Sequence, residues 1–289
     1  FETYQRIQNQ IGMAGTKGYF GDMYMAKSDY NSAIRFYDEA LRLYRSLGNV
    51  PGTAQMQSSM GKANMLKGEY ETAIRYYEDA VASYDSIGDL DSKAFAEAGM
   101  GEVLVVQGQP QDALSKYRAA LLTYETQNDL QGQAMVNSKI GDIEYSQMEY
   151  ELALGDYKKS LSLYQKLKME IETADLLTRI GQTQTQLGDY GSSLSNLEKA
   201  LSIKQKKGLK SDVAYIHTLI GDSLAGWGNS EEAKASYDEA QSVYRQLGDQ
   251  VGLATSLYGL GRMQYLIGEL DNALGNFEEA LVIFREMRD

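Results

Sequence analysis

The chain has 289 residues, 43% of them hydrophobic and 24% charged, which is the composition of an ordinary folded protein. A formal net charge of -12 argues against a general nucleic-acid binder, because such a protein needs a basic surface to displace counterions. The absence of cysteine excludes disulfides, thiolate metal sites and a cysteine nucleophile, and the longest apolar runs, such as Val103–Val106, are too short to span a membrane.

A glycine recurs every 40 residues through almost the whole chain. The seven positions are Gly21, Gly61, Gly101, Gly141, Gly181, Gly221 and Gly261. An alanine follows each of them 12 residues later, except that Ser193 takes its place once. A fixed period of this length predicts an array of stacked units rather than a globule with one central core.

The array divides into seven predicted repeats that follow a short segment. The repeats are residues 11–50, 51–90, 91–130, 131–170, 171–210, 211–250 and 251–289. Residues 1–10 are predicted to be the tail of a preceding repeat helix, because Tyr4 and Ile7 fall in register with Tyr44 and Leu47. The chain starts at Phe1 rather than methionine, so we expect a fragment or a processed product whose parent protein continues on one or both sides.

Each repeat is predicted to contain two helices, as residues 51–90 illustrate. The first helix is expected over Pro51–Lys67, and Gly68 ends it. The second is expected over about Glu69–Ile87, and its apolar side chains recur in steps of three and four, which places them on one face. They are Tyr70, Ala73, Tyr77, Ala80, Tyr84 and Ile87. The recurring glycine lies in the middle of the first helix, where it costs about 1 kcal/mol relative to alanine, so we expect a close contact between helices there.

The order of residues within a repeat resembles the tetratricopeptide repeat. A large apolar residue precedes the glycine, and an alanine, an aromatic residue and a second alanine follow, as in Phe20, Gly21, Ala33, Tyr37 and Ala40. The period of 40 resembles the longer variety found in Pins-like Leu-Gly-Asn proteins, kinesin light chains and bacterial peptide-sensing regulators. The resemblance implies an all-α fold, an α-solenoid in which about seven antiparallel helix pairs form a right-handed superhelix. Residues 11–289 would then be a single solenoid.

The resemblance also implies where a partner would lie, because the first helices of such arrays line a concave groove. The most used contact position follows the glycine and holds Asp22, Lys62, Glu102, Asp142, Gln182, Asp222 and Arg262. One turn further along come Met25, Met65, Val105, Tyr145, Thr185, Ala225 and Tyr265. One turn back come Gly18, Ser58, Ala98, Ser138, Thr178, Thr218 and Tyr258. We expect a groove with an acidic floor, apolar patches in the first four repeats and a C-terminal cluster of Tyr258, Arg262 and Tyr265. Such a groove suits a partner with basic and apolar residues.

The sequence contains no convergent set of catalytic residues. The single histidine, His217, takes the position of the family's tryptophan, and we expect it to pack or to lie at the surface. No glycine-rich phosphate loop and no metal-ligand spacing is present. We therefore expect no cofactor, no metal and no enzyme activity.

The fifth repeat departs most from the pattern. Ser193 replaces the alanine, Leu197 and Lys204 replace tyrosines, and five lysines gather in its second half. They are Lys199, Lys204, Lys206, Lys207 and Lys210. This cluster is interpreted as a second contact site, as a flexible joint, or as drift on a solvent-facing edge.

We predict that the chain is a non-catalytic scaffold or adaptor that holds a peptide or a partner protein along the groove, and we expect it in the cytoplasm because no secretory signal is visible. Two alternatives remain open. The first is a peptide-responsive regulatory domain of a larger signalling protein. The second is a self-associating module, a homo-oligomer in which terminal faces carrying Tyr4, Ile7, Phe284 and Met287 pair with other copies.

Overall fold

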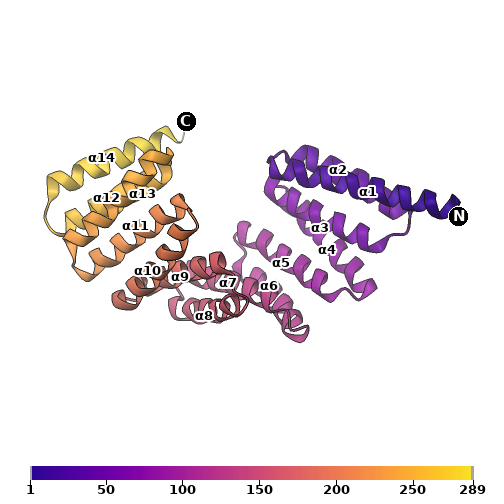
Figure 1. Ribbon diagram of the computed structural model, residues 1–289, viewed down its shortest axis with the longest axis horizontal. Helices are drawn as coiled ribbons and strands as arrows, with labels where there is room; N and C mark the ends of the chain where they lie inside the picture. The colour runs from indigo at the N-terminus through magenta and orange to yellow at the C-terminus, as the bar shows by residue number, and fades with distance from the viewer. Residues whose placement is uncertain (1, 288–289) are drawn as a thin grey trace. The chain divides into compact units, whose positions relative to one another are not determined.

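The computed structural model describes residues 2–287, and the side chains of residues 6–287 (Figure 1). Within these residues the chain forms fourteen α-helices and no β-strand, which confirms the predicted all-α fold. The helices are α1 (Glu2–Ala26), α2 (Tyr30–Ser46), α3 (Val50–Lys67), α4 (Tyr70–Ile87), α5 (Leu90–Val106), α6 (Pro110–Thr126), α7 (Leu130–Ser146), α8 (Tyr150–Lys166), α9 (Glu170–Gln186), α10 (Tyr190–Lys206), α11 (Lys210–Trp227), α12 (Ser230–Leu247), α13 (Gln250–Leu266) and α14 (Leu270–Glu286).

The helices fall into two compact units, Phe1–Ile143 and Glu144–Asp289, which we call the N-terminal and the C-terminal unit. In the N-terminal unit α1 packs on α2, α3 on α4 and α5 on α6, while α2–α3 and α4–α5 contacts join successive pairs. The C-terminal unit repeats this arrangement with the pairs α9–α10, α11–α12 and α13–α14. Because short turns connect consecutive helices, neighbours run antiparallel, and the predicted stacking of helix pairs in an α-solenoid is confirmed.

The first helices of the pairs form one surface within each unit. In the N-terminal unit α1 contacts α3 and α3 contacts α5, and in the C-terminal unit α9 contacts α11 and α11 contacts α13. Among the described residues of either unit, no two second helices make a comparable contact. The first helices therefore lie on the inner side of the stack in each unit, and we call this side the first-helix surface.

Left-handed residues make the turns between helices. Gly68 ends α3 with φ of 88°, and Gly228 ends α11 with φ of 91°, a conformation that glycine adopts without a steric penalty. The same turn is made without glycine at Ser28, Asn128, Met148 and Lys168. Several helices then begin at an aspartate or asparagine cap, as at Asp249, whose carboxylate accepts a hydrogen bond from the amide of Gly252.

The recurring glycine of the first helix is a notch filled by the second helix of the same pair. A methyl group built at Gly21 would lie 2.3 Å from Cε1 of Tyr37, and one built at Gly221 would lie 2.8 Å from Cε1 of Tyr237. The other described pairs of this kind are Gly61 with Tyr77, Gly101 with Tyr117, Gly181 with Leu197, and Gly261 with Phe277. The predicted close contact is thus confirmed at these six glycines, because a larger residue there would collide with the side chain of the second helix.

The predicted apolar stripe of the second helix forms the core between pairs. In α4, Ala73, Tyr77, Ala80 and Tyr84 are all buried. The last member of the stripe, Ile87, is 40% exposed. Ile87 is the final residue of α4, next to the left-handed Gly88.

The helix α1 differs from the other first helices. It runs unbroken from Glu2 to Ala26, so residues 2–10 continue directly into it, whereas Gly48 breaks the chain at the corresponding place between α2 and α3. The side chain of Tyr4, one of the residues that set the predicted register, lies outside the described side chains. No described helix combines the length and apolar character that a bilayer crossing requires.

Candidate functional site

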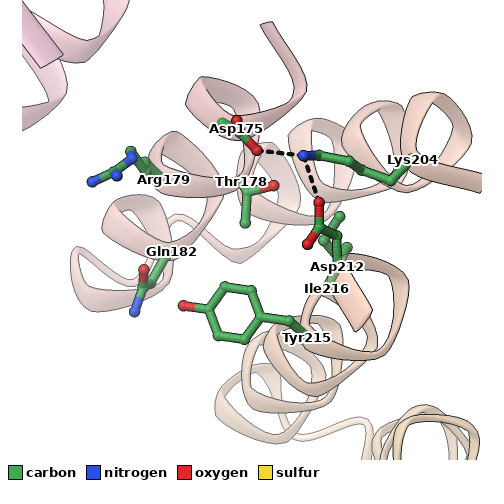
Figure 2. A pocket seen from close by; sticks show the side chains of 8 residues that line it. All are labelled: Asp175, Thr178, Arg179, Gln182, Lys204, Asp212, Tyr215 and Ile216. Carbon is green, nitrogen blue, oxygen red and sulfur yellow. Dashed lines mark hydrogen bonds and ion pairs between the residues drawn. The ribbon is translucent and has the colours of Figure 1, made fainter. Parts of the chain in front are cut away.

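A pocket of about 300 Å³ opens in the C-terminal unit, where α9, α10 and α11 meet (Figure 2). Polar and charged side chains make up most of its wall. The lining residues are Asp175, Thr178, Arg179 and Gln182 from α9, Lys204 from α10, and Asp212, Tyr215 and Ile216 from α11. Since α9 and α11 are both first helices, the pocket lies on the first-helix surface.

Lys204 lies buried at the bottom of the pocket. Its side chain is only 2% exposed, and its ammonium group makes ion pairs with Asp175 and with Oδ2 of Asp212, the latter at 2.7 Å (Figure 2). A buried ammonium requires such partners, because an unpaired charge in a protein interior is strongly unfavourable. Lys204 therefore holds one carboxylate from each neighbouring first helix in a fixed position.

The charge of Lys204 is retained despite its burial. Burial alone would lower the pKa of the ammonium group, but the hydrogen bonds and charges of Asp175 and Asp212 outweigh this and raise it. The two carboxylate side chains are themselves 50% and 46% exposed. Each carboxylate thus joins the buried lysine on one side and reaches the pocket and solvent on the other.

The rim of the pocket adds donors, acceptors and an aromatic ring. Arg179 is exposed, Gln182 is half-buried, and the hydroxyl of Tyr215 points toward the side of the pocket where Gln182 lies (Figure 2). Desolvation raises the pKa of Tyr215, so its hydroxyl stays protonated and can both donate and accept a hydrogen bond. The pocket has no formal net charge, because the two aspartates, Asp175 and Asp212, balance the two cations, Lys204 and Arg179.

The residues that follow the recurring glycine, which are predicted to contact a partner, differ in their surroundings. Gln182 lines the pocket. Asp22 and Asp222 each accept a hydrogen bond of 2.7 Å, from the hydroxyl of Tyr37 and of Tyr237 respectively. Glu102 makes an ion pair of 2.9 Å with Lys139, Asp142 is half-buried, and Lys62 and Arg262 are exposed. Part of the predicted acidic floor is therefore already paired within the chain.

The predicted residues one turn further along are partly apolar. Met25 and Met65 are half-buried and pack against the cores of their helix pairs. The ring centroid of Tyr145 lies 5.3 Å from that of Tyr150, and burial raises the pKa of Tyr145 to about 12. On α13 both Tyr258 and Tyr265 are exposed, and the ring of Tyr258 lies 5.8 Å from that of Phe277.

The residues predicted to line the groove one turn before the glycine are mostly buried. Five of them do not face solvent: Gly18, Ser58, Ala98, Thr178 and Thr218. Their burial leaves little of their surface open to a groove; a methyl group built on Gly18, for example, would lie 3.2 Å from Cε of Met56 on α3. Thr178 additionally borders the pocket. The positions that do reach the pocket from α9 and α11 include Asp175 and Tyr215, which stand at the same place in their repeats.

The lysine-rich segment of the fifth repeat also needs correction. Lys204 is buried and paired, so it belongs neither to an exposed basic cluster nor to a solvent-facing edge. Lys199, Lys206 and Lys210 are exposed, and Lys207 pairs with Glu170. The sequence does carry a signal: eight residues separate Lys204 from Asp212, the spacing that separates Tyr44 from Gly52, Tyr124 from Gly132 and Tyr244 from Gly252.

Other candidates for chemistry do not form a site. Among the described residues, no three His, Asp or Glu side chains are placed to hold a metal ion. His217 is half-buried on α11, and burial lowers its pKa, so the imidazole is neutral near pH 7. It thus matches the packing position predicted for it.

The structure resembles several solved proteins at low sequence identity. The apo form of RapI aligns with a TM-score of 0.75 and 14% identity over 95% of this chain and 98% of that one. Aspartyl phosphate phosphatase F from Bacillus subtilis aligns with a TM-score of 0.73 and 15% identity, over 98% and 73% of the two chains. The Rap conjugation gene regulator of the plasmid pLS20, in complex with the Phr* peptide, aligns with a TM-score of 0.66 and 14% identity, over 94% and 73%.

These structural likenesses concern the fold. Comparison with curated protein sequences finds none that matches the chain. The family model of the tetratricopeptide repeat matches residues 12–86, 131–206 and 212–286, which together make up well over half of the chain. Three matched segments, the helix pairs and the glycine notches agree on one assignment: the chain belongs to the tetratricopeptide-repeat family.

Proposed function

We propose that the chain is a non-catalytic interaction module and that its pocket holds a segment of a peptide or partner protein. The observation that carries this proposal is the buried Lys204, which fixes Asp175 and Asp212 on two adjacent first helices while leaving both carboxylates half exposed. Fixed polar groups around a concavity bind a ligand without first having to be ordered. Such preorganisation lowers the entropy cost of binding a ligand.

The chemistry of the pocket suits a peptide. Asp175 and Asp212 can accept hydrogen bonds from a basic side chain or from backbone amides, and Arg179 and Gln182 can donate to backbone carbonyls. The ring of Tyr215 and the side chain of Ile216 offer apolar area beside them. An extended segment with a basic residue next to an apolar one matches this set. The net charge of -12 adds a long-range attraction for such a partner.

The similar structures support the same class of ligand. One of them, the regulator of the plasmid pLS20, is a complex with the Phr* peptide. A peptide-responsive regulatory domain is therefore our second candidate, in which occupation of the pocket changes how the first helices pack. Another similar structure is an aspartyl phosphate phosphatase. Hydrolysis of an aspartyl phosphate by the purified chain would contradict the non-catalytic proposal.

We also propose that the other first-helix positions extend the contact beyond the pocket. They are Asp22, Met25, Lys62, Met65, Glu102, Asp142, Tyr145, Asp222, Tyr258, Arg262 and Tyr265, whereas Gln182 belongs to the pocket itself. The charge-reversing variants Glu102→Arg and Asp142→Arg test this extension in the N-terminal unit. They should weaken the binding of a basic peptide if its segment reaches that unit, and leave binding unchanged if the pocket alone holds it.

The test of the pocket uses a displayed library of random peptides selected on the immobilised chain. The enriched sequences should combine lysine or arginine with an apolar residue, and a synthetic copy gives the affinity by fluorescence anisotropy. Gln182→Ala and Tyr215→Ala should each weaken binding at least about tenfold, which is about 1.4 kcal/mol. Gln186→Ala, an exposed position of the same helix outside the pocket, is the matched control. Equal loss in the control, or no loss in either pocket variant, would remove the pocket from the proposal.

A further inference from the structure

A second cavity, of about 270 Å³, lies between α10, α11 and α12, three consecutive helices of the C-terminal unit (Figure 1). Two of these three are second helices, and the cavity shares no lining residue with the pocket described above. It is therefore a separate site. Its walls are Gln205 and Gly208 around the end of α10, Lys210 and Val213 from α11, and Val243 and Gln246 from α12.

Two valines form the floor of the second cavity and leave space unfilled. Val213 and Val243 are half-buried, whereas the other lining residues are exposed. At the next junction between helix pairs the same repeat positions hold Leu253 and Ile283, which are only 5% and 7% exposed and belong to one core cluster. Each valine is one methylene smaller than its counterpart, so the second cavity is open where two methylenes are missing.

The junction that the second cavity borders also lacks the aromatic ring found in other junctions. At the next junction a methyl group built on Gly252 would lie 2.2 Å from the ring of Tyr244. Lys204 and Asp212 take the places of that tyrosine and that glycine between the fifth and sixth repeats. The stem of a lysine is thinner than a phenol ring, so this junction is less completely filled.

The rim of the second cavity is polar and carries a positive charge. Lys210 is exposed and has no ion-pair partner among the described residues. The exposed side-chain amides of Gln205 and Gln246 add hydrogen-bond donors and acceptors. None of the six lining residues is acidic. Such a rim attracts a carboxylate rather than a cation.

The size of the second cavity limits its occupant to a side chain. Pockets that hold whole small-molecule ligands have volumes of about 300–1,000 Å³, which is larger than this cavity. One aliphatic side chain can pack on Val213 and Val243 and supply the apolar contact that Leu253 and Ile283 make at the next junction. A carboxylate beside that side chain would lie at the rim, next to Lys210.

We propose that the second cavity binds an aliphatic side chain of a partner protein, in a segment where the adjacent residue is aspartate or glutamate. The lysine-rich segment of the fifth repeat thus contributes to a second contact site through Lys210. The carboxylates of the pocket described above suit a basic residue, so this inference concerns a different chemistry and goes beyond the proposed function. The net charge of -12 opposes a strongly acidic partner, so we expect one or two acidic residues in the segment rather than a long run.

The first experiment selects a displayed library of random peptides on the double variant Gln182→Ala/Tyr215→Ala. These substitutions disable the pocket of the proposed function, so peptides that bind there should not be enriched. The enriched peptides should carry leucine, isoleucine or valine next to aspartate or glutamate. A synthetic copy should bind the wild type and the double variant with equal affinity in fluorescence anisotropy. A selection without such peptides overturns this inference and leaves the proposed function standing.

The second experiment fills the second cavity. Val213→Leu combined with Val243→Ile installs the larger side chains found at Leu253 and Ile283, so the melting temperature should not fall. The affinity for the selected peptide should fall at least about tenfold. Val251→Leu adds a methylene to an exposed valine outside the cavity and is the matched control, which should bind as the wild type does. A filled variant that binds the peptide as tightly as the wild type overturns the proposal.

The third experiment reverses the charge at the rim. Lys210→Glu should weaken binding of the selected peptide at least about tenfold. Lys199→Glu, at an exposed lysine of α10 that does not line the cavity, should leave the affinity unchanged. A peptide whose acidic residue is replaced by the corresponding amide should bind the wild type and Lys210→Glu equally, because the charge contact is then absent. Equal losses in the two lysine variants would show a general attraction between charges and contradict a contact at this rim.

Discussion

The hydroxyl of Tyr237 donates a hydrogen bond of 2.7 Å to Oδ1 of Asp222, the residue that follows the glycine notch filled by the same tyrosine. Tyr37 and Asp22 repeat this relationship in the first pair at the same distance. The position that the family resemblance marks as a partner contact therefore also serves the fold here. The two roles are compatible, since a carboxylate has a second oxygen and further lone pairs.

Asp222→Asn should stabilise the protein at neutral pH. Burial raises the pKa of Asp222, with the Tyr237 bond and Arg262 opposing the shift. A carboxyl whose pKa rises on folding contributes stability below its ordinary value of 3.8 and loses that contribution as the pH rises through the raised value. Asparagine keeps an acceptor for Tyr237 without the charge. Urea unfolding should show a gain of roughly 0.5–2 kcal/mol at pH 7 that vanishes below the ordinary pKa of aspartate.

The matched control for this prediction is Asp22→Asn, which alters the same tyrosine bond at an exposed carboxylate. A gain of equal size at Asp22 would show that burial is not the cause. A loss of stability at Asp222 at neutral pH would show that the charge pairing with Arg262 outweighs desolvation.

Alanine at two helical glycines should have effects of opposite sign. Gly221→Ala puts a methyl group 2.8 Å from Cε1 of Tyr237, and such overpacking costs about 1–3 kcal/mol. Gly155→Ala meets nothing within 4 Å and should stabilise its exposed helix by about 0.5–1 kcal/mol. Thermal unfolding of the two variants measures the difference. If Gly221→Ala melted at or above the wild-type temperature, the notch would be looser than the structure indicates.

The fold could be predicted from the sequence because each feature recurs at a fixed spacing. Gly221 and Tyr237 are sixteen residues apart, as are Gly61 and Tyr77, so one repeat already contains the contact that stabilises it. The ends of the helices were predictable for the same reason, since Gly68 and Gly228 mark turns that only a left-handed residue can make. The exposed Ile87 was not, because whether a terminal residue is covered depends on its neighbours in three dimensions.

The candidate site was predicted only in part. Gln182 follows from the repeat register, but Lys204 replaces a tyrosine, and its charge suggested a surface position. Its burial depends on Asp175 and Asp212, which lie on two other helices. Sequence periodicity shows which positions are equivalent. It does not show that two residues that depart from the pattern, such as Lys204 and Asp212, interact with each other. That interaction becomes visible only when the spacing between them is compared with the tyrosine-to-glycine spacing of the other repeats.

Lys168→Gly should stabilise the turn between α8 and α9. Lys168 has φ of 58°, a left-handed conformation that costs a residue with a Cβ roughly 1–2 kcal/mol and costs glycine little. Part of this gain is offset by the greater freedom of glycine in the unfolded chain, so we expect a net stabilisation of about 0.5–1 kcal/mol. Chemical unfolding measures it. Lys166→Gly, inside the last turn of α8, is the control and should destabilise.

Lys204→Tyr and Asp212→Gly should be harmful singly and tolerated together. Lys204→Tyr leaves Asp175 and Asp212 without their cation and presses a ring onto a carboxylate, and Asp212→Gly leaves the buried ammonium with one partner. The double variant recreates the junction seen at Tyr244 and Gly252. The coupling free energy from the four urea midpoints should favour the double variant by about 1–3 kcal/mol. Additive effects would show that the two positions are independent.

Between the fifth and sixth repeats, Lys204 and Asp212 stand where other junctions have a tyrosine and a glycine. This difference affects which repeats can pair with each other during folding. Repeats of similar sequence can pair with the wrong neighbour during folding, since the tyrosine of one repeat can pack against the equivalent glycine of several others. If Lys204 packed against Gly132 or Gly252, its ammonium group would lose the carboxylate of Asp212. If Tyr124 or Tyr244 packed against Asp212, it would bury a carboxylate that has no cation beside it. The ion pair between Lys204 and Asp212 thus favours the correct pairing of the fifth and sixth repeats over pairing with other repeats of similar sequence.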